Sequence, residues 1–476
     1  MIAATPTSAT PPILPELADR ILTTAACLHL SWHAFDGTNP IISTLGAYAT
    51  VLPRSAIPTV LPTVLRHVPQ LSLDQASYAG NVRALDAWSL CQGNRYLTPP
   101  VYSEYAVDSA STNGHVHVLA WWLASGLLIK YSDEALDRAS ANGHVAVLDW
   151  WKDSTELPLW YTWAMDWASG DGHIDVLTWW KHSGLTLRHT EIAVNKASQN
   201  GHVSVLDWWL AEAPTLEFKY SSHAMDYASN CGQLAVLKWW REHPGLDLRY
   251  THLAMDLASK DGHVHILEWW LHSGLELRYS AEAIKWASLE GHVNVLEWWL
   301  ASGLEIMYGS DAMDSASLRG HVAVLDWWRK HSGLDPQYTS AAINEASWAG
   351  HVCVLDWWLA SSLQLKYTAD AIDRASGAGR LDVLDWWTRN KSHVPLMYTE
   401  RAMDLASKFG HVDTLEWWRG SGLELMYSAE AVDQASRGGQ IDILEWWLRK
   451  SGLPLKYTVA AMDGALGYCQ LDILQW

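Results

Sequence analysis

Histidine and aspartate return at regular intervals along this chain, and these two residue types supply many of the metal ligands and general acid–base groups of proteins. The recurring histidines are His115, His144, His173, His202, His263, His292, His321, His351 and His411. The recurring aspartates are Asp108, Asp137, Asp166, Asp226, Asp256, Asp314, Asp373, Asp404, Asp433 and Asp463. Two closely spaced pairs, His115 with His117 and His263 with His265, could suggest zinc.

The regularity itself favours a structural role for both residues. An active site needs unlike residues that converge on one place, whereas here the same residue returns in each copy. A spacing of two does not place a histidine pair on one helix face. We therefore predict that the histidines bond backbone groups at turns and that the aspartates accept from a neighbouring N–H or hydroxyl. No nucleophile, phosphate-loop or metalloprotease motif is present, so we expect no enzyme, no cofactor, no metal and no small-molecule substrate.

Tryptophan is the compositional outlier, with 32 Trp against 3 Phe, and twelve Trp-Trp pairs run from Trp121-Trp122 to Trp446-Trp447. Such pairs could stack single-stranded nucleic acid, but we favour core filling, because each side chain carries a large apolar area. The residue before a pair is usually acidic: Asp149, Asp207, Glu268, Glu297, Asp326, Asp356, Asp385, Glu416 and Glu445. This acidic row is either a solvated surface or a binding surface for a basic partner.

Charge and composition narrow the class of protein. The 476 residues carry a formal charge of −19, which argues against nucleic acid or an anionic membrane as the partner. No window of ~18 consecutive apolar residues could span a membrane. The five cysteines are scattered, which fits reduced thiols in an intracellular, cytoplasmic protein.

The chain is built from an internal repeat, A-φ-D-x-A-S-x-x-G-H-V-x-V-L-x-W-W, where φ is apolar. Its glycines are Gly80, Gly114, Gly143, Gly172, Gly201, Gly232, Gly262, Gly291, Gly320, Gly350, Gly379, Gly410 and Gly439, mostly 29 to 31 residues apart. A further copy starts at Ala461 and stops at Trp476. We predict an all-α solenoid of helical pairs over residues 72–476, with about 13 complete repeats and a truncated last repeat.

Each repeat predicts two short helices. In the copy around Gly291, Ser280 is a good N-cap, and the glycine falls where a left-handed residue would end the first helix. The second helix is expected from about His292 to Leu300. Its apolar arc, centred on Val295, Leu296 and Trp299, is too wide for one packing partner, so we expect it to pack against its own first helix and both neighbouring repeats.

The pattern resembles the ankyrin repeat. The run GHVNVLEWWLASGLE at Gly291–Glu305 is similar to the family's G-H-x-x-V-V-x-x-L-L-x-x-G-A, and the segment Leu253–Ser259 is similar to its T-P-L-H-L-A-A. The resemblance implies a solenoid whose first helices line a concave, protein-binding side. Three features depart from the family: the shorter period, Asp in place of the first His, and paired Trp in place of paired Leu. The first two departures argue against long finger loops as the binding site.

The N-terminal segment differs in composition from the array. Residues 1–13 are rich in Pro, Ser and Thr and are expected to be disordered, and residues 14–71 are expected to form a helical cap on the first repeat. The run Leu14-Pro15-Glu16-Leu17 also faintly resembles the start of an F-box. The first hypothesis is a non-enzymatic protein–protein interaction scaffold with an unknown protein partner. The alternative is a substrate-recognition subunit of a ubiquitin ligase.

A candidate binding surface follows from variation between the copies. The residues nine, five and two positions before the glycine share one face of the first helix, and we call this face the stripe. In the middle copies the stripe is apolar: Trp163, Trp167, Tyr227, Leu253, Leu257, Trp286, Leu289, Leu318 and Trp348. Exposed aromatic clusters often mark protein-binding sites, although these side chains could also simply pack against neighbouring layers.

Overall fold

The computed structural model describes residues 73–90, 102–153, 156–212 and 214–467. Within these ranges the regular structure is helical throughout and no β-strand is present, which confirms the prediction of an all-α helical-repeat solenoid. The predicted disordered tail, the predicted cap with its F-box resemblance, and the end of the truncated last repeat lie outside the described residues.

Each repeat forms one layer of two antiparallel helices, and layers are named here by their repeat glycine. The first helices are α4 (Leu73–Tyr78), α6 (Tyr105–Thr112), α8 (Glu134–Ala141), α10 (Ala164–Gly170), α12 (Glu191–Asn200), α14 (His223–Asn230), α16 (Leu253–Lys260), α18 (Ala281–Leu289), α20 (Asp311–Arg319), α22 (Ala341–Ala349), α24 (Asp370–Gly377), α26 (Arg401–Lys408), α28 (Glu430–Arg437) and α30 (Val459–Gly467). The second helices are α5 (Val82–Leu90), α7 (Val116–Ala124), α9 (Val145–Asp153), α11 (Ile174–His182), α13 (Val203–Glu212), α15 (Leu234–Glu242), α17 (Val264–His272), α19 (Val293–Ala301), α21 (Val322–Lys330), α23 (Val352–Ala360), α25 (Leu381–Arg389), α27 (Val412–Gly420) and α29 (Ile441–Glu445), which continues as the π-helical η1 (Trp446–Lys450).

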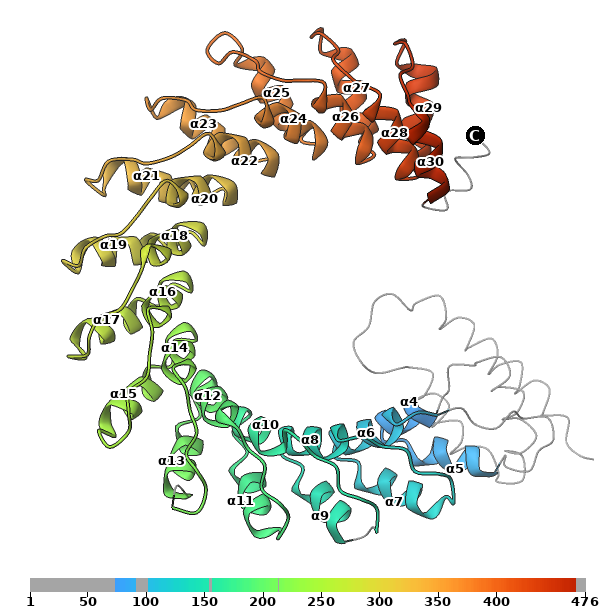
Figure 1. Cartoon of the computed structure of the whole chain (residues 1–476), viewed down its shortest axis with the longest axis vertical. Helices are drawn as coiled ribbons and strands as arrows, with labels where there is room; N and C mark the ends of the chain where they lie inside the picture. Colours follow the sequence, from blue (N-terminus) through green and yellow to red (C-terminus); the bar gives the residue numbers. More distant parts are fainter. Residues whose placement is uncertain (1–72, 91–101, 154–155, 213, 468–476) are drawn as a thin grey trace, which may run out of the picture. The chain divides into compact units, whose positions relative to one another are not determined.

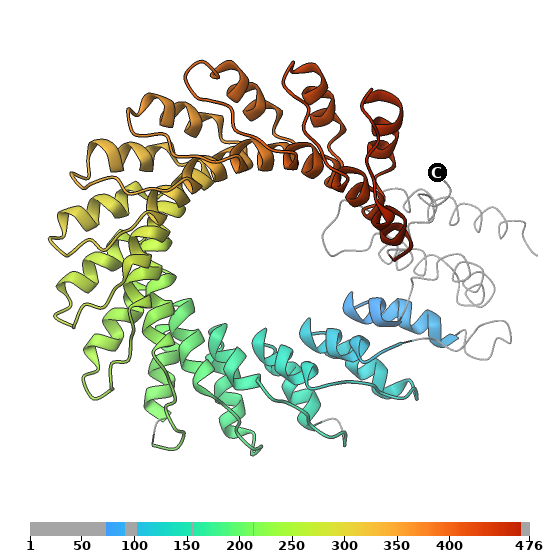
Figure 2. The same ribbon diagram turned by 45° about the horizontal axis from the view of Figure 1, so that its top comes forward.

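The chain divides into two compact units between Ala224 and Met225, inside α14. In each unit the helices stack in series, so that α6 packs on α4 and α8, and α18 packs on α16 and α20. Figure 1 shows the first helices of a unit in one row and the second helices in the other. The first helices pack more closely on each other than the second helices do, so each unit curves toward its first helices (Figure 2).

Layer Gly291 shows why the sequence folds into this pair. Ser280 has extended backbone and its hydroxyl accepts from the N–H of Glu282, so it caps α18. Gly291 follows at φ 83°, a left-handed conformation that suits glycine. Both predicted helices are confirmed, and the second begins at Val293.

The core of the layer is the predicted apolar arc. Val295, Leu296 and Trp299 are buried, and Trp298 at the margin is buried as well. In this layer α19 packs on its own first helix, α18, and also contacts the neighbouring second helices α17 and α21. A short unit thereby completes its core by sharing it with its neighbours. No helix in the described ranges is long and apolar enough to cross a bilayer.

Candidate interaction surface

The recurring aspartates join consecutive first helices. In layer Gly262, the carboxylate of Asp256 accepts from the backbone N–H and the hydroxyl of Ser280, which begins the first helix of the next layer. We call this pair of hydrogen bonds the cap bond. Asn195 and Asn344 join the same positions with one bond reversed: the amide oxygen accepts from the backbone N–H of Ser221 or Thr368, and the amide N–H donates to the hydroxyl. Burial raises the pKa of Asp256, yet both oxygens have partners, as predicted for a structural role.

The recurring histidines explain why the repeat glycine is needed. A Cβ atom at Gly291 would lie 2.8 Å from two ring atoms of His321 in the next layer. The glycine thus provides both the left-handed turn and the space for this ring. In layer Gly114 the ring N–H of His115 donates to the Tyr78 carbonyl at 3.2 Å, and burial lowers the His115 pKa. These rings bond backbone, as predicted.

The second tryptophan of each pair is buried and bonds the layer before it. The indole N–H of Trp299 donates to the Ser259 hydroxyl at 3.0 Å, and Trp122, Trp180 and Trp418 make the corresponding bond in their layers. The two rings of a pair meet edge to face, as Trp298 and Trp299 do at 5.2 Å. The burial of the second ring in each pair confirms that it fills the core.

The first tryptophan bonds the acidic row, a relationship that the sequence did not suggest. The indole N–H of Trp298 donates to Glu268 of the preceding layer at 2.7 Å, and we call this the indole bond. The other acceptors of this kind are Asp86, Asp149, Asp326, Asp356, Asp385 and Glu416. These carboxylates therefore hold layers together, a role that neither sequence interpretation included.

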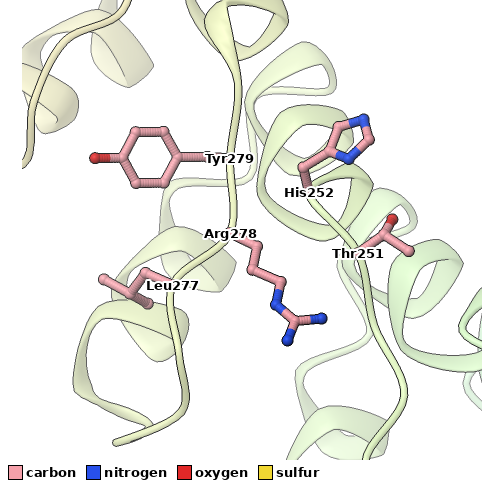
Figure 3. Close-up of a pocket in the computed structure, with 5 residues that line it drawn as sticks. All are labelled: Thr251, His252, Leu277, Arg278 and Tyr279. Carbon is pink, nitrogen blue, oxygen red and sulfur yellow. The ribbon is translucent and has the colours of Figure 1, made fainter.

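The turns between layers form a further row of contacts. The hydroxyl of Tyr250 donates to the Glu276 carbonyl of the next turn at 3.0 Å, which we call the tyrosine bond. Arg278 donates back to the Tyr250 carbonyl at 3.2 Å and lies over that ring. Figure 3 shows the open hollow beside these residues, lined by Thr251, His252, Leu277, Arg278 and Tyr279. Arg278 also pairs with Glu276, and the Thr251 hydroxyl donates to Asp226 in its cap bond.

The roles of the buried serine and the turn tyrosine were missed from the sequence. Both residues recur in nearly all copies, as Ser259 and Tyr250 do in layer Gly262. A polar residue that recurs at a buried helical position needs a hydrogen-bond partner, which another layer can supply. That recurrence was the signal that could have revealed the bonds to Trp299 and Glu276.

The stripe residues lie on the first helices with their side chains half-buried or exposed. Trp163 on α10 is 37% exposed and Trp348 on α22 is 42% exposed. Trp167, Tyr227, Leu253, Leu257, Trp286, Leu289 and Leu318 are half-buried. The stripe thus retains surface that a partner could cover.

Within a unit, stripe residues of neighbouring layers touch. In unit 1 the Arg138 guanidinium lies 4.7 Å from the Trp167 ring. In unit 2 Arg374 lies 5.0 Å from the Trp348 ring and pairs with Glu345. The helices α16, α18, α20 and α22 pack in series, so the structure brings Leu253, Leu257, Trp286, Leu289, Leu318 and Trp348 onto consecutive helices. Tyr227 lies one layer earlier on α14, and Trp163 and Trp167 belong to unit 1.

Neither histidine pair forms a metal site. His117 bonds the Gly80 carbonyl at 3.0 Å and His265 bonds the Gly232 carbonyl at 3.3 Å. In the described ranges no group of three or more His, Cys, Asp or Glu side chains could hold a metal ion.

Known proteins similar to this chain were found among solved structures. No protein-family model and no curated protein matches the chain. Among solved structures, the pentatricopeptide repeat protein PPR10 from maize is similar, with 12% identity, a TM-score of 0.29, and coverage of 98% of this chain and 86% of that chain. A TM-score this low assigns neither a repeat family nor a partner, and the comparison does not single out the ankyrin family.

One sequence prediction is wrong as it was stated, namely that the chain has no nucleic-acid partner. That exclusion rested on net charge and on the buried Trp pairs. The maize protein has pentatricopeptide repeats, a kind of helical repeat that reads one RNA base with two or three side chains. A helical solenoid with varying side chains in successive layers therefore does not exclude RNA. The chain is a helical-repeat solenoid whose repeated residues bond layer to layer and whose varying residues form the stripe.

Proposed function

We propose that the chain is a non-enzymatic binding scaffold whose stripe recognises a protein partner. One observation carries the proposal. The residues that the layers repeat are engaged in bonds between layers, as Asp256 is with Ser280 and Trp299 is with Ser259. The stripe positions instead differ from layer to layer and keep exposed surface. Variation at such positions can encode a partner without weakening the solenoid.

The composition of the stripe in unit 2 supports a protein as the partner. Leucine and tryptophan side chains lie partly exposed on four consecutive first helices, α16 to α22. Aromatic and large apolar side chains that remain accessible contribute most of the binding energy in protein interfaces. Farther along the unit the stripe becomes charged, with Arg374, Arg401 and Asp370.

We also infer that the repeats are a short, Trp-rich form of the ankyrin type. The left-handed glycine between the two helices and the close packing of the first helices support this assignment. The free thiols Cys231 and Cys353 support an intracellular location.

Affinity capture with a matched pair of variants tests the proposal. The stripe variant carries Trp286→Ser, Leu289→Ser and Trp348→Ser. The control carries Leu300→Ser, Met397→Ser and Leu448→Ser, which change exposed apolar residues outside the stripe. Each full-length bait is incubated with lysate of the source cells, once untreated and once treated with nuclease, and bound proteins are quantified by mass spectrometry. Equilibrium denaturation checks that both variants fold.

We expect the stripe variant to lose its main partner by at least about tenfold, as for interface hot spots, while the control retains it. A partner that stays bound to the folded stripe variant would rule out the stripe as the site. A partner that disappears after nuclease treatment in the wild-type sample as well would point to RNA and contradict a direct protein partner.

A further inference from the structure

One junction in unit 2 lacks bonds that its neighbours have. It lies between layer Gly291, made of α18 and α19, and layer Gly320, made of α20 and α21. In the described part of unit 2, the other consecutive layers are joined by a cap bond, from Asp226–Thr251 to Asp433–Thr458. The junction after layer Gly291 has none.

Both partners of the cap bond are changed at this junction. Lys285 stands at the position of the aspartate, and Gly309 stands at the position of the capping Ser or Thr. Lysine cannot accept a hydrogen bond and glycine has no hydroxyl to donate. Lys285 instead pairs with Glu282 at 3.1 Å and lies 4.0 Å from Asp311. These ion pairs are partly exposed, so they replace little of the lost attachment.

Sterics do not require the glycine. Gly309 does not have a positive φ, and a Cβ atom there would meet nothing within 4 Å. A serine would therefore fit at this position, as Ser280 does in the preceding layer.

Two further bonds are missing around the same layer. Trp327 of α21 is buried, and its indole N–H has no partner in the structure as described, although Glu297 stands where the acceptor of the indole bond is expected. Among the described residues, no tyrosine bond joins Tyr279 to the next turn, whereas Tyr250 and Tyr338 make theirs. Met307 stands where Arg278 bonds back in the preceding turn, as Met397 and Met426 do in two later turns.

The hydrogen bonds that remain between the two layers lie at one end of the junction. His321 packs against Gly291 and bonds the Leu289 backbone. The Trp328 indole N–H donates to Ser288 at 3.3 Å. Ser288 and Leu289 are the last two residues of α18, while the missing cap bond belongs to the beginning of α20. At the beginning of α20 the two first helices keep their packing and the long Lys285–Asp311 contact, but no hydrogen bond joins them there. Hydrogen bonds at one end alone leave the other end freer to move, as at a hinge.

We propose that this junction is a hinge of unit 2, at which the layers on either side rotate about the contacts of Gly291 with His321 and of Ser288 with Trp328. In a linear array each junction contributes its own interface energy, so the junction with the fewest bonds opens most readily. The hinge separates Trp286 and Leu289 from Leu318 on the stripe, and opening it widens the stripe there. This inference concerns motion and stands whether or not the stripe binds a protein.

Spin-label distance measurements on the full chain test the hinge. In a background with the five cysteines changed to serine, one sample carries labels at positions 265 and 323, which span the hinge and the junction before it. The control carries labels at 323 and 382, which span two junctions that have cap bonds. His265, Ala323 and Asp382 are equivalent exposed positions. Electron–electron resonance gives the width of each distance distribution.

We expect the pair across the hinge to give a distribution about twofold broader than the control pair. The double variant Lys285→Asp/Gly309→Ser, which restores both partners of the cap bond, should narrow it to the control width. The reverse variant Asp256→Lys/Ser280→Gly, which removes the cap bond of the preceding junction, should broaden it further without changing the control pair. Circular dichroism verifies folding, and Gly309→Ser alone serves if the double variant does not fold. Equal widths in the wild type, or no narrowing in the folded restoring variants, would overturn the proposal.

Discussion

The carboxylate of Asp256 accepts two hydrogen bonds from Ser280 in the next layer, one from the backbone N–H at 2.9 Å and one from the hydroxyl at 2.5 Å. The same hydroxyl accepts from the N–H of Glu282 at 3.2 Å. The serine therefore caps its own helix while it is held by the layer before it. Helix capping and layer stacking depend on each other at this point.

Asp256→Ala should destabilise the array, because it removes both acceptors and leaves the buried N–H of Ser280 without a partner. A loss of about 1–3 kcal/mol in the free energy of unfolding is expected. Asp256→Asn should cost clearly less, because Asn195 and Asn344 already join the same positions. Equilibrium urea denaturation of the two variants measures the difference, and equal losses would contradict the cap bond.

Trp299→Ala should cost about 3–5 kcal/mol locally, as other large-to-small changes in cores do, because the side chain is 1% exposed. Trp299→Phe should cost less, since it keeps an aromatic ring in the core and loses only the bond to Ser259 and part of the packing. In a linear array this damage can separate the flanking layers rather than unfold them together. Hydrogen exchange of the layers before and after layer Gly291 shows whether they unfold separately or together. An unchanged free energy of unfolding for Trp299→Ala would contradict the burial of Trp299.

His144 should make the array less stable in mild acid. Burial lowers its pKa in the folded chain, whereas an unfolded histidine titrates near about 6.5. The folded state therefore favours the neutral ring, and this contribution is present above about pH 6.5 and lost as the pH falls through the folded pKa. His144→Gln removes the titration, and Gln440 already occupies the equivalent place against Gly410. The wild type should lose stability relative to this variant between pH 7.5 and 5 in denaturation series, and parallel curves would contradict the effect.

Asp137 should have the opposite effect on the pH dependence, making the array more stable in mild acid. Burial raises its pKa to about 6 despite the hydrogen bonds from the N–H groups of Trp163 and Thr162, and an unfolded aspartate titrates near about 3.9. Its contribution is fully present below about pH 4 and is lost as the pH rises through about 6. As the pH falls from 7 to 4, the free energy of unfolding of the wild type should therefore rise by about 1–3 kcal/mol relative to that of Asp137→Asn. A difference that does not change with pH in the same denaturation assay would contradict the raised pKa.

The sequence was sufficient to predict each layer because the information is local. The N-cap Ser280, the left-handed Gly291 and the apolar arc around Trp299 lie within twenty residues of one another and follow helical periodicity. The bonds between layers were harder to predict. Trp298 and Glu268 are 30 positions apart, and their pairing depends on how far one layer is displaced along the next. The spacing of apolar residues within one helix does not give that displacement.

The stripe could be located by spacing, but its exposure could not. Arg138 covers the Trp167 ring while Trp348 stays 42% exposed, and the difference depends on which side chain the neighbouring layer contributes. The hinge was missed for a related reason. Lys285 and Gly309 each look like ordinary variation alone, and only the cap bonds of the other layers show that they replace two partners of one interaction.

The bond between each second tryptophan and the serine of the layer before it has a genetic consequence. Because donor and acceptor are the same residue types in successive layers, as in Trp299–Ser259 and Trp270–Ser229, a duplicated layer brings both halves of the bonds that its insertion requires. Unequal crossing-over between such units can lengthen or shorten the array by whole layers without creating a new interface. The stripe residues are then free to diverge in each copy, so the number of recognition positions can change faster than the fold that carries them.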